Sequence, residues 1–341
     1  MTLYPLLMAP YFRSGAETPW GGSMLRDAFM KDAPEQTGES LEISALPGRE
    51  SVVRNGAHAG KSLDRMIELW GEALTGPIQG QFPLLLKLID AKETLSVQVH
   101  PGDEYAAANE GGKLGKTEAW VILNCEPGAK LAYGLNLNGR PLSEVFSEGA
   151  DAIEGALNWV EVRPGDVYYI PCGLVHAIGA GIQLYEIQQS SDMTYRFWDW
   201  GRVGKDGKPR PLHVRQALDV SDPSLRPGKL FGTTALCKGG SRSYYISNRY
   251  FELCRLNVSG AMPIADGRMH FITPLGPCTL RWGEESLELN PFDSALIPAA
   301  LENVIVESED CKVLMSSPSN REWLREELGY RAENVAGLTE D

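Results

Sequence analysis

The chain has little of what marks membrane, secreted and nucleic-acid-binding proteins. No run approaches the roughly 20 apolar residues of a membrane-spanning helix, and the apolar N-terminal stretch lacks a basic segment and contains Pro5 and Pro10. The six cysteines form no CxxC pair, which is typical of small buried thiols in a reducing cytoplasm. With 32 basic and 45 acidic residues, the net charge of −13 disfavours nucleic acid and anionic membranes as partners. We therefore expect a cytoplasmic protein. Because the net charge is negative, binding of an anionic small molecule would require a local pocket of basic residues.

The distribution of short apolar segments predicts the fold class. The length of 341 residues and the 43% apolar content fit one large catalytic domain and a smaller one. Short strands with Gly and Pro turns dominate residues 82–188 and 237–315, which is typical of antiparallel sandwiches and barrels. The first 50 residues look irregular apart from a short strand at residues 42–44. Helical spacing is confined to a few stretches, at residues 62–74, 141–146, 151–157, 214–218 and 320–334.

We predict a mainly β protein of two jelly-roll barrels, with a few helices in and around the first. The catalytic domain would cover residues 1–235, including an N-terminal segment, helical insertions and a linker. A second β domain would cover residues 236–341 and end in a closing helix.

A spacing of turn residues recurs in the two halves. The first copy fits the second cupin motif, a turn into a strand that delivers one histidine to a barrel interior: Gly165, Pro171, Gly173 and His176. The second copy has the same spacing: Phe292, Pro298, Ala300 and Asn303. Because Asn303 replaces the histidine, the repeat predicts that only the first barrel binds metal.

Two histidines, a glutamine and a glutamate form the candidate metal site. Gln98 and His100 are two residues apart, so on a strand both side chains face the same side. Glu118 opens the next strong strand, and His176 follows the Pro/Gly turn. Such a nitrogen and oxygen set suits zinc with an open position, and would also accept manganese, iron or cobalt. The alternative is a pair of hydrogen-bonded barrel histidines.

A rival carboxylate ligand lies closer to the first histidine. Glu104 has the generic cupin spacing after His100, but it belongs to a Pro-Gly-Asp-Glu turn in which a solvated acid is usual. Glu118 begins a strand that continues in apolar residues, so we favour Glu118.

Basic residues near this site favour an anionic ligand. Lys116 precedes Glu118 by two residues and would share its face of the strand. Arg196 is surrounded by Tyr195, Phe197 and Trp198, and a preorganised guanidinium binds phosphate or carboxylate through two hydrogen bonds. The alternative for Arg196 is a structural arginine packed on aromatic rings.

Three sequence motifs resemble those of the type I mannose-6-phosphate isomerases in their shorter bacterial form. The motifs are LSVQVHP at residues 95–101, GKTEAW at 115–120 and SDMTYR at 191–196. Residues 19–22 and 38–44 resemble the N-terminal segments of that family. The match runs from about Trp20 to Arg202 and continues more weakly through the second barrel.

The resemblance implies a cupin-fold, zinc-dependent aldose–ketose isomerase of carbohydrate metabolism that interconverts mannose 6-phosphate and fructose 6-phosphate. It implies one zinc ion per chain with four ligands: Gln98, His100, Glu118 and His176. It gives Arg196 a catalytic or phosphate-handling role, and Ser96 and Lys116 contacts to the substrate. The partner would be a small sugar phosphate, and the protein would be a monomer or a homodimer.

The base that moves the proton between C1 and C2 is the open point of this hypothesis. Glu186, on the strand after His176, and Asp192 are the candidates, although either could be a buried acid paired with Arg or Lys. Two other functions remain: a non-catalytic sugar-phosphate-binding cupin that acts as a regulatory paralogue, and an iron-dependent cupin oxygenase. The basic residues beside the site and the glutamine ligand disfavour the oxygenase.

Overall fold

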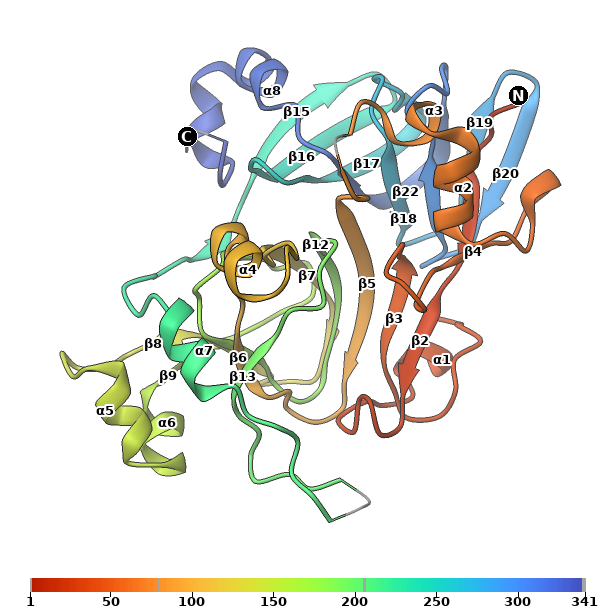
Figure 1. The fold of residues 1–341 in the computed structure, drawn as a ribbon. Coiled ribbons are helices and arrows are strands. Elements are labelled where there is room, and N and C mark those ends of the chain that lie inside the picture. Colours follow the sequence, from red (N-terminus) through yellow and green to blue (C-terminus); the bar gives the residue numbers. More distant parts are fainter. Residues whose placement is uncertain (1, 79, 205–206, 339–341) are drawn as a thin grey trace. The chain divides into compact units, whose positions relative to one another are not determined.

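The computed structural model describes residues 2–78, 80–204 and 207–338, and these residues form a mainly β fold (Figure 1). They build three sheets of ten, seven and five strands. In the described parts of the chain, the first and last strands of each sheet do not pair, so the sheets are open. The mainly β prediction is confirmed, and the strands of the predicted jelly rolls lie in open sheets.

Two of the sheets carry the predicted catalytic residues. The order of the seven-stranded sheet is β14 (Lys229–Leu230), β10 (Val167–Ile170), β7 (Glu118–Cys125), β12 (Ile182–Gln189), β5 (Leu84–Ala91), β3 (Thr37–Ile43) and β2 (Tyr11–Ser14). The order of the five-stranded sheet is β13 (Tyr195–Trp198), β6 (Val97–Val99), β11 (His176–Ile178), β8 (Lys130–Leu135) and β9 (Leu157–Glu161).

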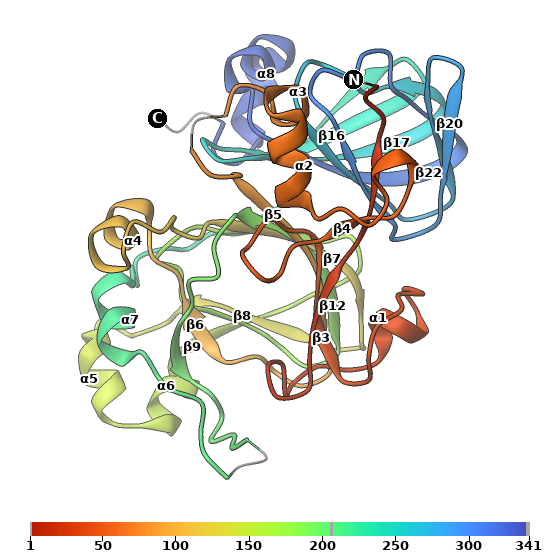
Figure 2. The same cartoon turned by 45° about the vertical axis from the view of Figure 1, so that its right-hand side comes forward.

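The two faces of the five-stranded sheet have different partners. On the inner face, Leu131, Tyr133 and Ile178 share one apolar core with side chains of β7, β10 and β12. On the outer face, Val97 and Phe197 belong to a second apolar core that includes residues of three helices: α5 (Leu142–Ser147), α6 (Ala150–Ala156) and α7 (Val214–Val220). Figure 2 shows these helices along the outside of this sheet. The alternation of side chains along β6 and β13 therefore separates apolar packing from the polar inner face.

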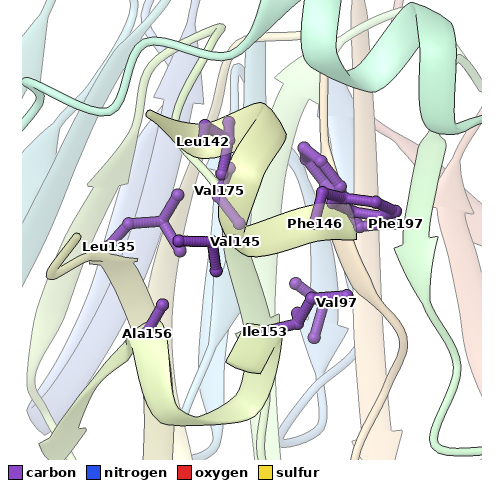
Figure 3. A pocket seen from close by; sticks show the side chains of 9 residues that line it. All are labelled: Val97, Leu135, Leu142, Val145, Phe146, Ile153, Ala156, Val175 and Phe197. Carbon is purple, nitrogen blue, oxygen red and sulfur yellow. The ribbon is translucent and has the colours of Figure 1, made fainter. Parts of the chain in front are cut away.

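A small apolar cavity lies where α5 and α6 pack on the outer face (Figure 3). Its volume is about 10 Å³ and its lining is wholly apolar: Val97, Leu135, Leu142, Val145, Phe146, Ile153, Ala156, Val175 and Phe197. The helices thus pack with almost no empty space against the outer face of the strands that carry Gln98 and Arg196.

The ten-stranded sheet is built around the C-terminal part of the chain. Its order is β15 (Thr233–Cys237), β16 (Gly240–Ser247), β17 (Glu252–Pro263), β22 (Ile305–Ser317), β18 (His270–Pro274), β21 (Ser294–Ile297), β1 (Leu6–Ala9) and β4 (Val52–Val53). Two further strands form a hairpin that joins β22: β19 (Cys278–Trp282) and β20 (Glu285–Leu289).

The chain divides into two compact units that differ from the expected division at residue 235. One unit contains Phe12–Ser40 and Leu88–Lys229, and the other contains Met1–Tyr11, Leu41–Lys87 and Leu230–Asp341. The reason is strand pairing, because β1 pairs with β21 and with β4 inside the ten-stranded sheet. The N-terminal strands therefore complete the C-terminal sheet.

The first 50 residues are more regular than predicted, since they contain β1, β2, β3 and a short helix, α1 (Met24–Asp27). All seven residues of β3 are buried, including Glu39, Ser40 and Glu42. Buried polar residues hide the alternation on which a strand prediction depends. The sequence therefore indicates only the end of β3, at residues 42–44.

The remaining helices follow the predicted positions with local corrections. The predicted helix at 62–74 is divided at Gly71, where φ is +50°, into α2 (Leu63–Trp70) and α3 (Glu72–Thr75). The closing helix ends earlier, as α8 (Arg321–Leu328), and continues as a 3₁₀ turn, η2 (Gly329–Asn334). Besides α1, two helical elements were not predicted: the 3₁₀ turn η1 (Gly56–His58) and α4 (Asp103–Asn109). None of the helices in the described ranges has the length and hydrophobicity needed to cross a bilayer.

Candidate metal centre

Strand pairing sets three of the predicted site residues side by side. In the five-stranded sheet, Gln98 of β6 lies opposite His176 of β11 on one side and opposite Arg196 of β13 on the other. Directly opposed residues project to the same face of a sheet. The amide nitrogen of Gln98 is accordingly 3.3 Å from Nε2 of His176.

The two histidines converge on one carboxylate oxygen. Glu118, at the start of β7, has its Oε1 3.5 Å from Nε2 of His100 and 3.4 Å from Nε2 of His176. Among the described residues, His100, Glu118 and His176 form a group whose potential ligand atoms all lie within 4.8 Å of one another. All three side chains are buried.

The other ring nitrogens fix the orientation of both histidines. Nδ1 of His100 donates to the carbonyl of Met193 at 2.8 Å, and Nδ1 of His176 donates to the carbonyl of Leu174 at 2.9 Å. With Nδ1 protonated, each Nε2 presents a lone pair toward Glu118. Metal-binding histidines commonly have this arrangement, in which a backbone carbonyl holds the tautomer.

The charge states also fit a divalent cation. Burial lowers the pKa of His176 to about 3, and burial with the charge of Lys116 lowers the pKa of His100, so both imidazoles are neutral near pH 7. Burial opposes ionisation of Glu118, but Lys116 and His100 outweigh it and hold the pKa of Glu118 well below its usual range. Oε1 of Glu118 is buried and accepts no hydrogen bond. Two neutral imidazoles around such an oxygen form a suitable ligand set for a metal ion.

Lys116 brings a positive charge into the same cluster. Its Nζ is 2.7 Å from Oε2 of Glu118 and 3.2 Å from Nε2 of His100. Burial alone would lower the pKa of Lys116, but the negative charges of Glu118 and Glu186 outweigh burial and raise it. Lys116 is therefore charged beside the candidate metal ligands, as the sequence spacing predicted.

Of the two predicted bases, only Glu186 lies in this cluster. Glu186 of β12 is buried opposite Trp120 of β7, and the indole nitrogen of Trp120 donates to its Oε2 at 3.0 Å. The Trp120 ring in turn lies 5.3 Å from the His176 ring. The side chain of Asp192 is 47% exposed and is 3.9 Å from Nζ of Lys113. The rival ligand Glu104 is exposed on α4.

The remaining predicted residues lie on a strand of the site or directly before one. Ser96 is buried immediately before β6. Arg196 donates from Nη1 to the carbonyl of Pro211 at 2.9 Å, whereas its Nε is buried without a hydrogen-bond partner. Burial and the neighbouring charge of Arg210 lower the pKa of Arg196, which still leaves the guanidinium charged at neutral pH. A free donor thus remains on Arg196.

Sequence reasoning missed two polar contributors. Glu39 of β3 pairs with Arg13 of β2 at 2.9 Å, and its negative charge helps to raise the pKa of Lys116. Gln188 lies opposite Glu118 in the sheet and is buried with its Oε1 unpaired. Both residues are polar and lie inside buried strands. A single sequence does not distinguish such positions from polar positions on the surface.

Comparison with known proteins agrees with this geometry. Residues 13–118 match the family model described as phosphomannose isomerase type I, catalytic domain. The chain is 36% identical to the mannose-6-phosphate isomerase ManA of Bacillus subtilis, over 88% of this chain and 95% of that protein. It is 35% identical to the mannose-6-phosphate isomerase of Streptococcus mutans, over 83% and 90% of the two chains.

A solved structure agrees over nearly the whole length. The crystal structure of the mannose 6-phosphate isomerase from Bacillus subtilis superimposes with a TM-score of 0.84 at 33% identity, covering 92% of this chain and 99% of that one. With its cupin-type fold and its buried His-Glu-His cluster, this chain belongs to the type I phosphomannose isomerase family.

Proposed function

We propose that this chain is a zinc-dependent aldose–ketose isomerase that interconverts mannose 6-phosphate and fructose 6-phosphate. The observation that carries the proposal is the convergence of His100 and His176 on one unpaired oxygen of Glu118, with charged Lys116 in contact. Gln98, which contacts His176, would be the fourth ligand through its amide oxygen. Membership of the isomerase family supports the substrate.

The reaction moves a proton between C1 and C2 through a cis-enediol. A bound divalent ion would supply a Lewis acid for the negative charge that develops on the sugar oxygens. Lys116 and the unpaired donor of Arg196 would bind anionic groups of the substrate. Ser96, buried beside Gln98, would contribute a hydroxyl contact.

Glu186 is the residue that we assign to proton transfer. It is buried, it accepts a hydrogen bond from Trp120, and its negative charge helps to raise the pKa of Lys116. A carboxylate at this position could accept a proton from the substrate. Asp192 has the same chemistry but points to Lys113 at the surface, so its geometry supports the role less well.

A coupled assay tests the activity. The purified protein is supplied with zinc, and mannose 6-phosphate turnover is followed through conversion of the product to glucose 6-phosphate. We expect turnover that disappears after chelation and returns with zinc. No turnover by metal-replete protein would refute the isomerase assignment, and sugar-phosphate binding without turnover would favour the regulatory alternative.

The identity of the metal needs its own measurement. Zinc suits a mixed nitrogen and oxygen site with an open position, but manganese, iron and cobalt accept the same donors. Mass-spectrometric metal analysis of protein purified without added metal should give about one zinc ion per chain. Retention of another metal with full activity would correct the zinc assignment and leave the isomerase assignment intact.

A further inference from the structure

We propose that His213 is a positioning residue that holds Arg196 beside the metal ligand Gln98. The proposal rests on the function given above, in which Arg196 acts on the substrate. His213 lies far from the metal-ligand motifs in the sequence and directly precedes α7.

The main chain of Arg196 needs a partner because its strand lies at an edge. β13 is the first strand of the five-stranded sheet, so one side of its backbone lacks a neighbouring strand. His213 supplies both missing partners: its backbone N–H donates to the carbonyl of Arg196 at 2.9 Å, and its Nδ1 accepts from the N–H of Arg196 at 3.3 Å. One residue thereby takes the place of a strand.

These contacts determine how Arg196 faces Gln98. Since the backbone groups of Arg196 point toward His213, the Arg196–Gln98 pair is of the kind without mutual hydrogen bonds, in which opposed side chains come closest. The register of β13 shifts directly after Arg196, and such bulges redirect side chains next to functional sites. The His213 contacts hold this irregular backbone in one conformation.

His213 is itself anchored. Its carbonyl accepts from the N–H of Ala217 at 2.9 Å in the first turn of α7. Its ring lies 6.2 Å from the ring of Tyr195, whose hydroxyl donates to Glu110 at 2.8 Å. The histidine therefore connects the arginine to a helix and to a fixed aromatic ring.

The chemistry of the imidazole suits this role. Accepting a hydrogen bond at Nδ1 requires the neutral ring with its proton on Nε2. Burial and the positive charge of Arg196 lower the pKa of His213, which favours the neutral ring. Meanwhile Nη1 of Arg196 donates to the carbonyl of Pro211 and Nε stays unpaired. The segment thus positions Arg196 without occupying all its donors.

Three substitutions distinguish the effect of the hydrogen-bond acceptor Nδ1 from the effect of the size of the His213 ring. His213→Ala and His213→Phe both remove the acceptor, and Phe keeps an aromatic ring. Each should lower kcat by about tenfold, as expected for one lost orienting hydrogen bond, with the bound metal retained. His213→Asn should restore most of kcat because its side-chain oxygen can accept from Arg196. Leu212→Ala, at a neighbouring position that is 43% exposed, is the control and should leave kcat unchanged.

A double-mutant cycle distinguishes positioning from general structural damage. In an Arg196→Ala protein, adding His213→Ala should lower kcat by less than about twofold, because the group that His213 positions is gone. Full additivity would overturn the proposal. If Arg196→Ala alone lowers kcat but His213→Ala alone leaves kcat normal, the proposal is also overturned. The proposed isomerase function would then remain intact.

Amide hydrogen exchange tests the contact without turnover. The backbone amide of Arg196 should exchange faster in His213→Ala and His213→Phe than in the unsubstituted protein and in His213→Asn. Unchanged exchange in all variants would refute the positioning role even if the protein proved inactive on mannose 6-phosphate.

Discussion

At the scale of single residues, the candidate site depends on one carboxylate. Glu118 touches both histidines through Oε1 and the ammonium of Lys116 through Oε2. Its buried charge makes the cluster suitable for a cation and also keeps Lys116 protonated. A substitution that removes the charge of Glu118 but keeps the size of its side chain should weaken cation binding and lower the pKa of Lys116.

Glu118→Gln should lower metal affinity by at least about 100-fold, because the amide cannot replace the anionic ligand and no longer balances Lys116. Bound metal in the folded variant gives the readout. Glu104→Gln is the matched control: it removes a carboxylate from exposed α4 and should retain full occupancy. Loss of metal in Glu104→Gln together with full occupancy in Glu118→Gln would show that Glu104 is the ligand.

Glu186→Gln should lower kcat by about 10²–10⁴-fold, the usual contribution of a general base. The bound metal should be unaffected, since Glu186 contacts Trp120 and is not among the three clustered ligands. Asp192→Asn should change kcat little, because Asp192 is half exposed beside Lys113. A large loss in Asp192→Asn alone would transfer the base role to that residue.

At the scale of elements, the site is held from behind by helices. The outer residues of β6 and β13 pack against α5 and α6 (Figure 3). Gln98 and Arg196 lie opposite each other on the inner face of the same strands. Successive side chains of a strand point to opposite faces of the sheet. The same two strands therefore pack against α5 and α6 on one face and position the site residues on the other.

Phe197→Ala should reduce the free energy of unfolding by about 3–5 kcal/mol, the typical cost of removing a buried phenylalanine. Phe197 is buried and lines the apolar cavity under α5 and α6, so water would not fill the enlarged space favourably. Phe197→Leu should cost clearly less because it keeps most of the volume. Equal stabilities of both variants in urea unfolding would contradict this packing.

At the scale of the whole molecule, a partly buried ionic network stabilises the unit that contains the C-terminal strands. Asp266 accepts from Nε2 of His270 at 2.9 Å, and Nδ1 of His270 lies against the hydroxyl of Ser317. Arg268 joins Asp266 to buried Glu252. These contacts connect β17, β18 and β22.

The network predicts an acid-sensitive stability. Burial opposes the charge of Asp266, but the hydrogen bond and charge of His270 and the contacts of Arg268 outweigh it, so the pKa of Asp266 is lowered on folding. A lowered pKa means that the stabilisation is complete above the unfolded value of about 4 and is lost as the pH falls toward the folded value. Asp266→Asn should cost roughly 1–2 kcal/mol at pH 7 and progressively less below pH 4.

Urea unfolding between pH 2.5 and 7 measures this difference. Glu252, whose pKa burial raises, contributes with the opposite sign, so the comparison of Asp266→Asn with the unsubstituted protein is the informative quantity. A constant difference across the pH range would contradict the linkage.

The sequence by itself determined the strand-rich character of the chain and indicated the candidate metal-site residues. Gln98 and His100 are two residues apart on a strand, and the Pro/Gly turn before His176 sets that residue at a strand start. These local rules act over a few residues, so they can be read directly from a single chain.

Only the tertiary structure decided which partners these residues meet. The pairing of β1 with β21, the hydrogen bond from Trp120 to Glu186 and the contact between His213 and Arg196 all join segments distant in sequence. Buried polar residues in β3 also concealed the first part of a strand, of which the sequence indicated only the end at residues 42–44. Burial and long-range pairing arise when sheets form, so no local pattern in the sequence could specify them.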